Sequence, residues 1–311
     1  MASEKKDIWS TEAGFFPKYQ NAASFVPKLV GKVIGWLDVQ KDDVILDLGC
    51  GDGVLDLQFA EILSKGTGRL HGVDSSPSLI ETSQKAVEAA GYTNSTFEGM
   101  WSHCVKLSHA SKQSLVSHTA NTPPRRLVYD ANDIVDKPEL QKGQFNKAFS
   151  NAAMHWILSN TAKHEQFFHG VQNALQPGGV FVFEMGGLGN VTELVTGVVS
   201  SVSRRIGLEA AKKANPWFFP DEAWARDILE NRVGGWKVEK IEREWRETPA
   251  DAGGIDGWIR LMARPFLDAV PEAEREACTR EIVEVLEYTT RTPKGSHTMQ
   301  YVRLRVQARK L

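Results

Sequence analysis

Three glycines at alternate positions follow a short apolar run in residues 44–53, VILDLGCGDG. Gly49, Gly51 and Gly53 let the backbone turn sharply out of a buried strand and approach a ligand closely, because a Cβ atom would occupy the ligand's space. The helix predicted to begin near Gly53 would favour anionic groups at its N-terminus. An ordinary tight turn also uses glycines, but three of them directly after an apolar run favour a ligand site.

Two carboxylates accompany these glycines. Asp47 ends the first apolar run, and Asp74 ends the next one. The fingerprint of nicotinamide dinucleotide sites fails, because Val54 stands where its third glycine would be needed. A negative charge at Asp47 suits a cationic amino or sulfonium centre better than a diphosphate. Asp74 can accept both hydroxyls of a ribose, although it could also cap the helix predicted near Pro77. Together these features predict an S-adenosylmethionine site.

Apolar runs alternate with helical patterns along the chain, which predicts crossover units and a mostly parallel sheet. Strands are expected at residues 43–48, 69–74, 125–130, 145–151, 178–186, 236–245 and 301–309. Helices are expected at residues 25–37, 53–64, 76–91, 163–175, 192–206 and 221–230, and across 255–288. We therefore expect an α/β, Rossmann-like, seven-stranded and mostly parallel sheet with helices on both faces and a helical C-terminal substrate cap.

The 311 residues are predicted to form a single domain over 1–311. Residues 1–40 would be an N-terminal helical lid, and residues 190–232 and 253–290 would be the helical cap segments. Residues 99–124 show no sustained period of two or 3.6, which predicts an inserted, mobile loop. Its histidines and its cysteine fit no usual ligand spacing, so no metal site is expected.

Composition narrows the partners and the location. A net charge of -2 and a pI near 6.5 argue against nucleic acid as the main partner. The three cysteines are odd in number and far apart, which favours a reducing compartment. The N-terminal residues lack the apolar core of a signal peptide, and no apolar run is long enough for a membrane helix. We expect a cytoplasmic protein without a membrane partner.

The segments LDLGCGDG, GVDSSPSLIE, YDAND and FSNAAMHW resemble those of the class I methyltransferase family. FSNAAMHW, NPWFFPDEAW, GWIRLMARPFLDAVPEAERE and YVRLRVQARK are similar to the branch that contains trans-aconitate methyltransferase and its fungal relatives. The resemblance covers nearly all of the chain except the expected loop. It implies an S-adenosylmethionine-dependent enzyme that methylates a small molecule.

The resemblance also implies site residues. The cofactor's methionine part would meet Asp47, Gly49, Gly51 and Gly53; its ribose, Asp74 and Ser75; its adenine, Asp130 and Ala131. Asn151 and His155 would lie below the methyl group, and Tyr19 is a candidate to close over the cofactor. Asp130 could equally be a turn former at the end of a strand.

Methyl transfer from a sulfonium is a direct displacement, so alignment and exclusion of water are the main requirements. A carboxylate or thiolate acceptor needs no base, whereas a phenol or alcohol would use one, and His155 is then the candidate. The alternative for His155 is a core or pocket-wall histidine.

The acceptor is expected to bind to Trp156 and to four residues of the cap: Trp217, Trp258, Arg260 and Arg264. The two arginines, four residues apart on one predicted helix, could clamp an anionic group. They could equally lie on a solvated face and pair with acidic neighbours such as Asp268. On the clamp hypothesis, Arg260→Ala or Arg264→Ala would raise the Michaelis constant for the acceptor and leave cofactor affinity unchanged.

The sequence thus predicts a small-molecule methyltransferase, a monomer or weak homodimer, that methylates an oxygen of a carboxylate or hydroxyl, in secondary metabolism. Methylation of sulfur or nitrogen is an alternative. So is a regulatory protein that binds the cofactor without turnover. Methylation of a protein or RNA is disfavoured by the mild acidity.

Overall fold

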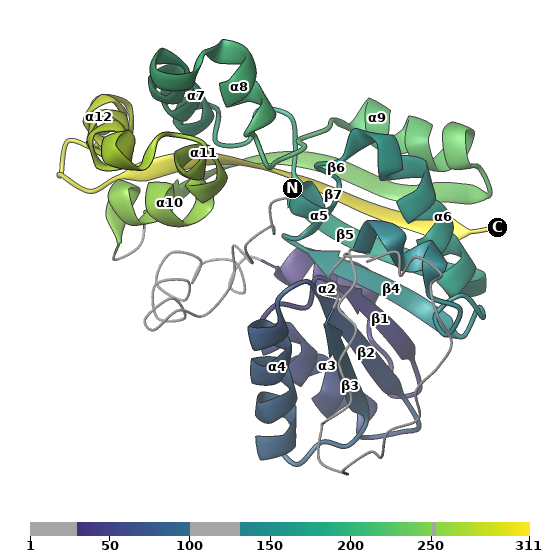
Figure 1. Ribbon diagram of the computed structural model, residues 1–311. Coiled ribbons are helices and arrows are strands. Elements are labelled where there is room, and N and C mark those ends of the chain that lie inside the picture. Colours follow the sequence, from purple (N-terminus) through teal and green to yellow (C-terminus); the bar gives the residue numbers. More distant parts are fainter. Residues whose placement is uncertain (1–29, 100–130, 251–252) are drawn as a thin grey trace, which may run out of the picture.

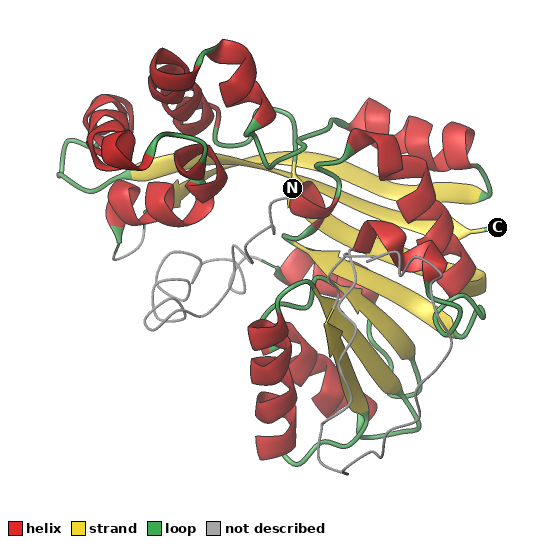
Figure 2. Cartoon of the chain, in the orientation of Figure 1, coloured by secondary structure: helices red, strands yellow, loops and turns green. Residues whose placement is uncertain are grey.

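The computed structural model describes residues 30–99, 131–250 and 253–311. In these ranges seven strands form one sheet, in the order β3-β2-β1-β4-β5-β7-β6 (Figure 2). Strands β1 to β5 run parallel, and β7 is antiparallel to both of its neighbours. The predicted Rossmann-like α/β fold with a seven-stranded, mostly parallel sheet is confirmed.

Six of the seven strands lie where the sequence pattern predicts them. The strands are β1 (Val44–Leu48), β2 (Arg69–Asp74), β3 (Ser95–Gly99), β4 (Phe145–Asn151), β5 (Leu175–Gly186), β6 (Trp236–Pro249) and β7 (Thr298–Lys310). The prediction of the third strand at residues 125–130 was wrong, because β3 takes that place beside β2. β3 is a five-residue edge strand with one large apolar residue, Phe97, so it leaves a weak pattern. Residues 125–130 lie outside the described ranges.

Helices cover both faces of the sheet (Figure 1). On one face α2 (Gly31–Leu37) and α3 (Val54–Leu63) pack over Ile45, Phe149 and Val182, with α4 (Pro77–Ala89) beside α3. The other face carries η2 (Ala131–Asp136), α5 (Met154–Ile157), η3 (Thr161–Lys163), α6 (His164–Ala174), α9 (Glu222–Arg226) and η4 (Asp227–Val233).

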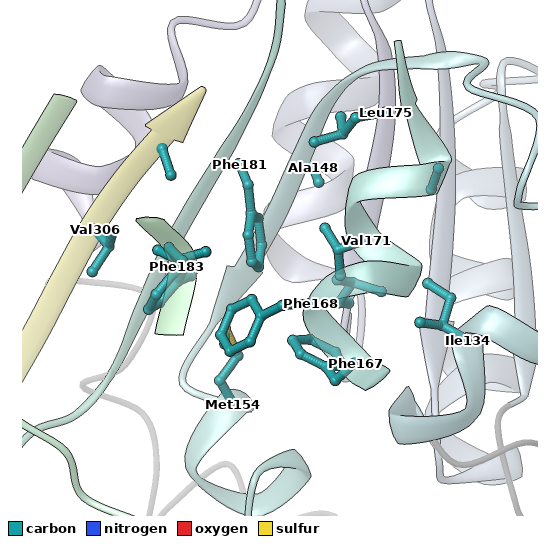
Figure 3. Close-up of a cluster of buried hydrophobic side chains, with 14 of the residues drawn as sticks. Ile134, Ala148, Met154, Phe167, Phe168, Val171, Leu175, Phe181, Phe183 and Val306 are labelled. Atoms are coloured by element: carbon teal, nitrogen blue, oxygen red, sulfur yellow. The ribbon is translucent and has the colours of Figure 1, made fainter. Parts of the chain in front are cut away.

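Strand β5 shows how one sequence serves both faces. Phe181 and Phe183 point to the cluster beneath α6, where Phe168 meets both phenylalanines (Figure 3). Met185 belongs to the same cluster. Val182 points to the opposite cluster, because successive side chains in a strand alternate between faces. The sheet is therefore buried on both sides, as parallel sheets are.

A second helical group lies beyond the carboxyl end of β5. It consists of α7 (Thr192–Ile206), α8 (Leu208–Lys213), α10 (Gly254–Met262), α11 (Arg264–Asp268) and α12 (Glu272–Thr290). β5 ends at Gly186, opposite Arg303, whereas the β6–β7 pairing continues to Thr298. This extension carries Met299 and Tyr301 into the hydrophobic cluster of these helices. Within the described ranges, none of the helices has the length and apolar character needed to cross a membrane.

Candidate active site

The glycine loop after β1 is built by three residues with positive φ. Gly49, Gly51 and Gly53 have φ of +83°, +60° and +76°. A Cβ on Gly49 would lie 2.2 Å from the Cβ of Ala153, and one on Gly53 would lie 2.8 Å from the Cβ of Ser83. A Cβ on Gly51 would meet no atom of the described chain within 4 Å. Packing thus requires two of the glycines, whereas the space beside Gly51 is free of described atoms, as its predicted ligand-binding role requires.

The carboxylate of Asp74 ties this loop to β2. It accepts the backbone N–H of Gly51 at 3.0 Å and that of Ser76 at 2.8 Å. Ser76, rather than Asp74, is the N-cap of α4, since its Oγ accepts from the N–H of Leu79 at 3.4 Å. Asp74 and its neighbour Ser75 are half-buried beside Gly51. Their ribose-binding role stays a prediction, and the loop contact gives Asp74 a second purpose.

A buried pair of carboxyls lies beneath the loop. Asp47, at the end of β1, is 3% exposed, and Asp56, in the first turn of α3, is fully buried. Neither oxygen of Asp56, nor Oδ1 of Asp47, has a hydrogen-bond donor among the described residues. Burial raises the pKa of Asp56 to about 7, and burial and Asp56 together raise the pKa of Asp47 well above its usual range. The pair therefore holds a proton near neutral pH.

Asp56 was not predicted from the sequence. It lies three, four and seven residues before Phe59, Ala60 and Leu63, which form the buried face of α3. A carboxylate on the apolar stripe of a helix is the signal that could have identified it.

The segment after β4 lies directly beside the glycine loop. Asn151 ends β4, and its buried Oδ1 accepts no hydrogen bond from the described residues. Ala152 has a positive φ of 56° and donates its N–H to the carbonyl of Glu184 at 2.8 Å. This turn presses Ala153 against Gly49 and sends His155 toward the end of β5.

His155 is a buried, neutral histidine. It is 8% exposed, and its Nδ1 accepts the backbone N–H of Gly186 at 3.3 Å, which leaves the ring proton on Nε2. Burial, and secondarily the positive charge of Arg303, lower the pKa of His155 to about 3. A general base works best with a pKa near the operating pH. The burial and the low pKa of His155 thus favour a histidine in the wall of the pocket over a general base.

The three tryptophans expected to bind the acceptor form one aromatic cluster with His155. Trp156 lies 5.7 Å from the His155 ring and 5.6 Å from Trp217, which in turn lies 6.0 Å from Trp258, between ring centroids. Phe219 packs 5.8 Å from His155 and stacks on Trp217. The predicted substrate residues from α5, α10 and the chain before α9 therefore meet at the end of β5.

The two arginines expected in the clamp turn toward carboxylates of the helical group instead of toward the aromatic cluster. Arg260, in α10, binds Asp256 at 2.8 Å and Glu276 at 2.9 Å. Arg264 starts a separate helix, α11, and its Nε lies 3.6 Å from Asp268. The structure thus has the alternative arrangement, a solvated face paired with acidic neighbours.

Of the residues predicted to bind the adenine, only Ala131 lies in the described ranges. Ala131 begins η2 and packs with Leu48 and Val73 near the carboxyl ends of β1 and β2. Asp130 and Tyr19 lie outside the described residues, so their roles stay predictions. In the same described ranges no group of three or more histidine, cysteine, aspartate or glutamate side chains is arranged to hold a metal ion.

Comparisons with known proteins identify the family. A family model described as a methyltransferase domain matches residues 39–103. A Schizosaccharomyces pombe protein described as an uncharacterized methyltransferase is 30% identical over 98% of this chain and 99% of its own. The chain belongs to this methyltransferase family, and it is an S-adenosylmethionine-dependent methyltransferase.

Solved structures share the fold at low sequence identity. The YcgJ protein of Bacillus subtilis is 14% identical, with a TM-score of 0.54 over 90% of this chain and 97% of its own. A Bacillus halodurans protein is 9% identical, with a TM-score of 0.53 over 91% of this chain and 99% of its own. At such identities the likeness concerns the fold. The trans-aconitate branch is not among these matches and remains a resemblance.

The loop fits S-adenosylmethionine on its own evidence. A Cβ on Gly51 would meet no described atom within 4 Å, and four carboxyls lie in the loop or in the elements that flank it: Asp47, Asp52, Asp56 and Asp74. Even with one proton on the buried Asp47–Asp56 pair, these carboxyls favour a ligand with cationic sulfonium and ammonium centres over a diphosphate. Asp47 with the three glycines would hold the methionine part, and Asp74 with Ser75 the ribose.

Proposed function

We propose that the protein methylates an oxygen of a small molecule, a carboxylate or hydroxyl, by direct displacement. The observation that carries this proposal is the contact between the cofactor loop and the segment leading to His155. The missing Cβ of Gly49 would lie 2.2 Å from Ala153. A methyl group held over the loop is thereby brought next to His155 and its aromatic neighbours.

S-adenosylmethionine supplies a methyl group on a sulfonium, and its C–S bond breaks as an acceptor lone pair forms the new bond. The chain's own residues orient the two partners and keep water away. Asp74 fixes the loop at Gly51 through a hydrogen bond. Asn151 and Ala152 form the turn after β4 beside this loop, and the N–H of Ala152 binds the carbonyl of Glu184. Trp156 and Phe219 supply apolar surface that excludes water.

The state of His155 favours an acceptor that is already ionised. With a pKa of about 3, its ring is a weak base at neutral pH. A carboxylate has no proton to lose before methylation, so it needs no base. A neutral His155 can then line the site and orient the acceptor through its dipole. A phenol or alcohol would need another group to take its proton.

The proposal is tested with methyl-labelled cofactor and a small-molecule extract. We expect label in a small molecule, as an ester that mild alkali releases as methanol. Alkali-stable label in an ether supports hydroxyl methylation, and label on sulfur or nitrogen contradicts oxygen transfer. Cofactor binding without any labelled product supports the regulatory alternative.

The remaining predictions extend this proposal. The helices α7, α8, α10, α11 and α12 would cap the acceptor, whereas α9 and η4, at the end of the predicted 190–232 cap segment, cover the sheet instead. Residues 1–40 would close over the cofactor, and the 99–124 segment would remain an insertion. Cys50 and Cys278 are free thiols, which supports a cytoplasmic location. The protein would be a monomer or a weak homodimer and would act in secondary metabolism.

A further inference from the structure

One face of β7 connects the helical group with the active site. Met299, Tyr301, Arg303 and Arg305 alternate along this strand and share a face. Met299 and Tyr301 pack in the aromatic cluster, and the Oη of Tyr301 accepts from Trp258 at 2.7 Å. Arg303 comes next, directly opposite Gly186 at the end of β5. Figure 1 shows β7 passing from α10–α12 into the sheet between β5 and β6.

Arg303 and Arg305 are both buried, but their contacts differ. Arg305 is 1% exposed and binds three carboxylates: Glu184, Glu242 and Glu244. Arg303 is 6% exposed and makes one hydrogen bond in the described chain, from Nε to Oε1 of Glu184 at 2.9 Å. Its Nη1 and Nη2 donate to none of the described residues. The guanidinium of Arg305 is thus fully paired with protein carboxylates. The outer nitrogens of Arg303, Nη1 and Nη2, remain available to bind a ligand.

The charge of Arg303 is only partly neutralised where it lies. Glu184 shares its single negative charge between the two arginines. The positive charge of Arg303 reaches His155 and contributes to lowering the pKa of that ring. Burying a cation is costly unless it is paired and hydrogen-bonded. A half-paired, nine-tenths buried arginine therefore indicates a site for an anion.

Its surroundings are those of the acceptor site. Gly186, opposite Arg303, donates its N–H to His155, and a Cβ on Gly186 would lie 2.5 Å from the ring of Phe219. Residues paired directly across two strands share a face. Arg303 therefore lies on the face of the sheet where Phe219 covers Gly186, beside the imidazole predicted to lie below the methyl group.

We propose that Arg303 determines acceptor specificity by binding a carboxylate of the substrate through Nη1 and Nη2. The bond from Nε to Glu184 fixes the plane of the guanidinium, so its two outer nitrogens form a fork that matches a planar carboxylate. Glu184 is the positioning residue, and Arg305 with its carboxylates anchors Glu184. The inference rests on the proposed function, because it assigns a ligand to the acceptor side of the same site.

The test compares carboxylates with their neutral amides on the full-length protein. Benzoate and succinate are titrated against benzamide and succinamide in the presence of S-adenosylhomocysteine, with the dissociation constants measured by NMR. We expect each carboxylate to bind about 10- to 100-fold more tightly than its amide, the range of hydrogen bonds to a charged group. Arg303→Gln should abolish this preference, and Arg303→Lys should restore part of it.

Arg309→Gln is the matched control. Arg309 lies on the same face of β7, but it is exposed and pairs with Glu239 at 2.6 Å. The Arg309→Gln variant should therefore keep the preference for carboxylates over amides. Binding of S-adenosylhomocysteine, measured in the same samples, reports the cofactor site separately and shows that each variant is folded.

Three results would overturn the assignment. The first is wild-type protein that binds the cofactor product but shows no preference for either carboxylate. The second is a preference that survives in a folded Arg303→Gln variant. The third is an equal loss in Arg309→Gln. If Arg303→Gln does not fold, the wild-type comparison and Arg303→Lys decide. Loss of S-adenosylhomocysteine binding by the wild type would instead contradict the proposed function.

Discussion

The cofactor side and the acceptor side of this site are built in opposite ways. The cofactor side is a contiguous loop, with Gly49, Gly51 and Gly53 held against β2 by Asp74. The acceptor side combines residues that are more than a hundred positions apart, such as His155 and Arg303, with ion pairs setting its charge. Backbone conformation therefore shapes the cofactor side, whereas the burial and pairing of side chains shape the acceptor side.

The largest expected effect is on the cofactor side. Gly49→Ala adds a Cβ 2.2 Å from Ala153 at a residue with a φ of +83°. Backbone strain and overpacking together should cost about 4 to 5 kcal/mol of unfolding free energy. Denaturant unfolding measures the loss. Gly51→Ala is the control, since its Cβ meets no described atom; an equal loss there would refute the distinction between packing and ligand glycines.

The next largest effect is the pH dependence of stability from Asp56. Its folded pKa of about 7 lies above the unfolded value of about 4, so its contribution is full below pH 4 and is lost as the pH rises through 7. Across this window the wild type should lose up to about 4 kcal/mol relative to Asp56→Asn. Urea unfolding at a series of pH values tests this. Parallel pH profiles would show that Asp56 carries no shifted proton.

Asp74→Ala should weaken cofactor binding by about 30-fold, or about 2 kcal/mol, because it frees the N–H of Gly51 and removes the predicted ribose acceptor. Calorimetry with S-adenosylhomocysteine measures the change. Ser76→Ala, which removes the α4 cap instead, should lower stability by about 1 kcal/mol and change affinity less. The reverse order would mean that Asp74 is purely structural.

The smallest effect is expected at Arg260. Its partners Asp256 and Glu276 form exposed ion pairs, so Arg260→Ala should change stability by less than about 1 kcal/mol. It should also leave the acceptor KM unchanged, in contrast to Arg303→Gln. Steady-state kinetics with the labelled cofactor decides. A raised KM would restore the clamp hypothesis for α10.

The contrast between the two sides also explains what the sequence could predict. Asp47 and Asp74 lie at the ends of strands with strong apolar patterns, and the glycines follow the first of them, so both their order and their place at one sheet edge could be inferred. The third strand could not, because Phe97 is nearly alone in a short edge strand. Arg303 could not be separated from Arg305 by spacing, since the difference between them lies in which carboxylates reach each one. Arg260 and Arg264 satisfied helical spacing, but each pairs with a carboxylate four residues away, and Arg260 also pairs with Glu276 of α12, which spacing within one helix does not reveal.

The central claim is that the loop around Gly51 binds S-adenosylmethionine beside His155. Calorimetric titration of S-adenosylhomocysteine into the wild type and Gly51→Val tests it most directly. We predict saturable binding to the wild type and its loss in a variant that remains folded, because the new side chain fills the open space at Gly51. Folded wild type that gives no binding heat, or equal binding by both proteins, would contradict the account.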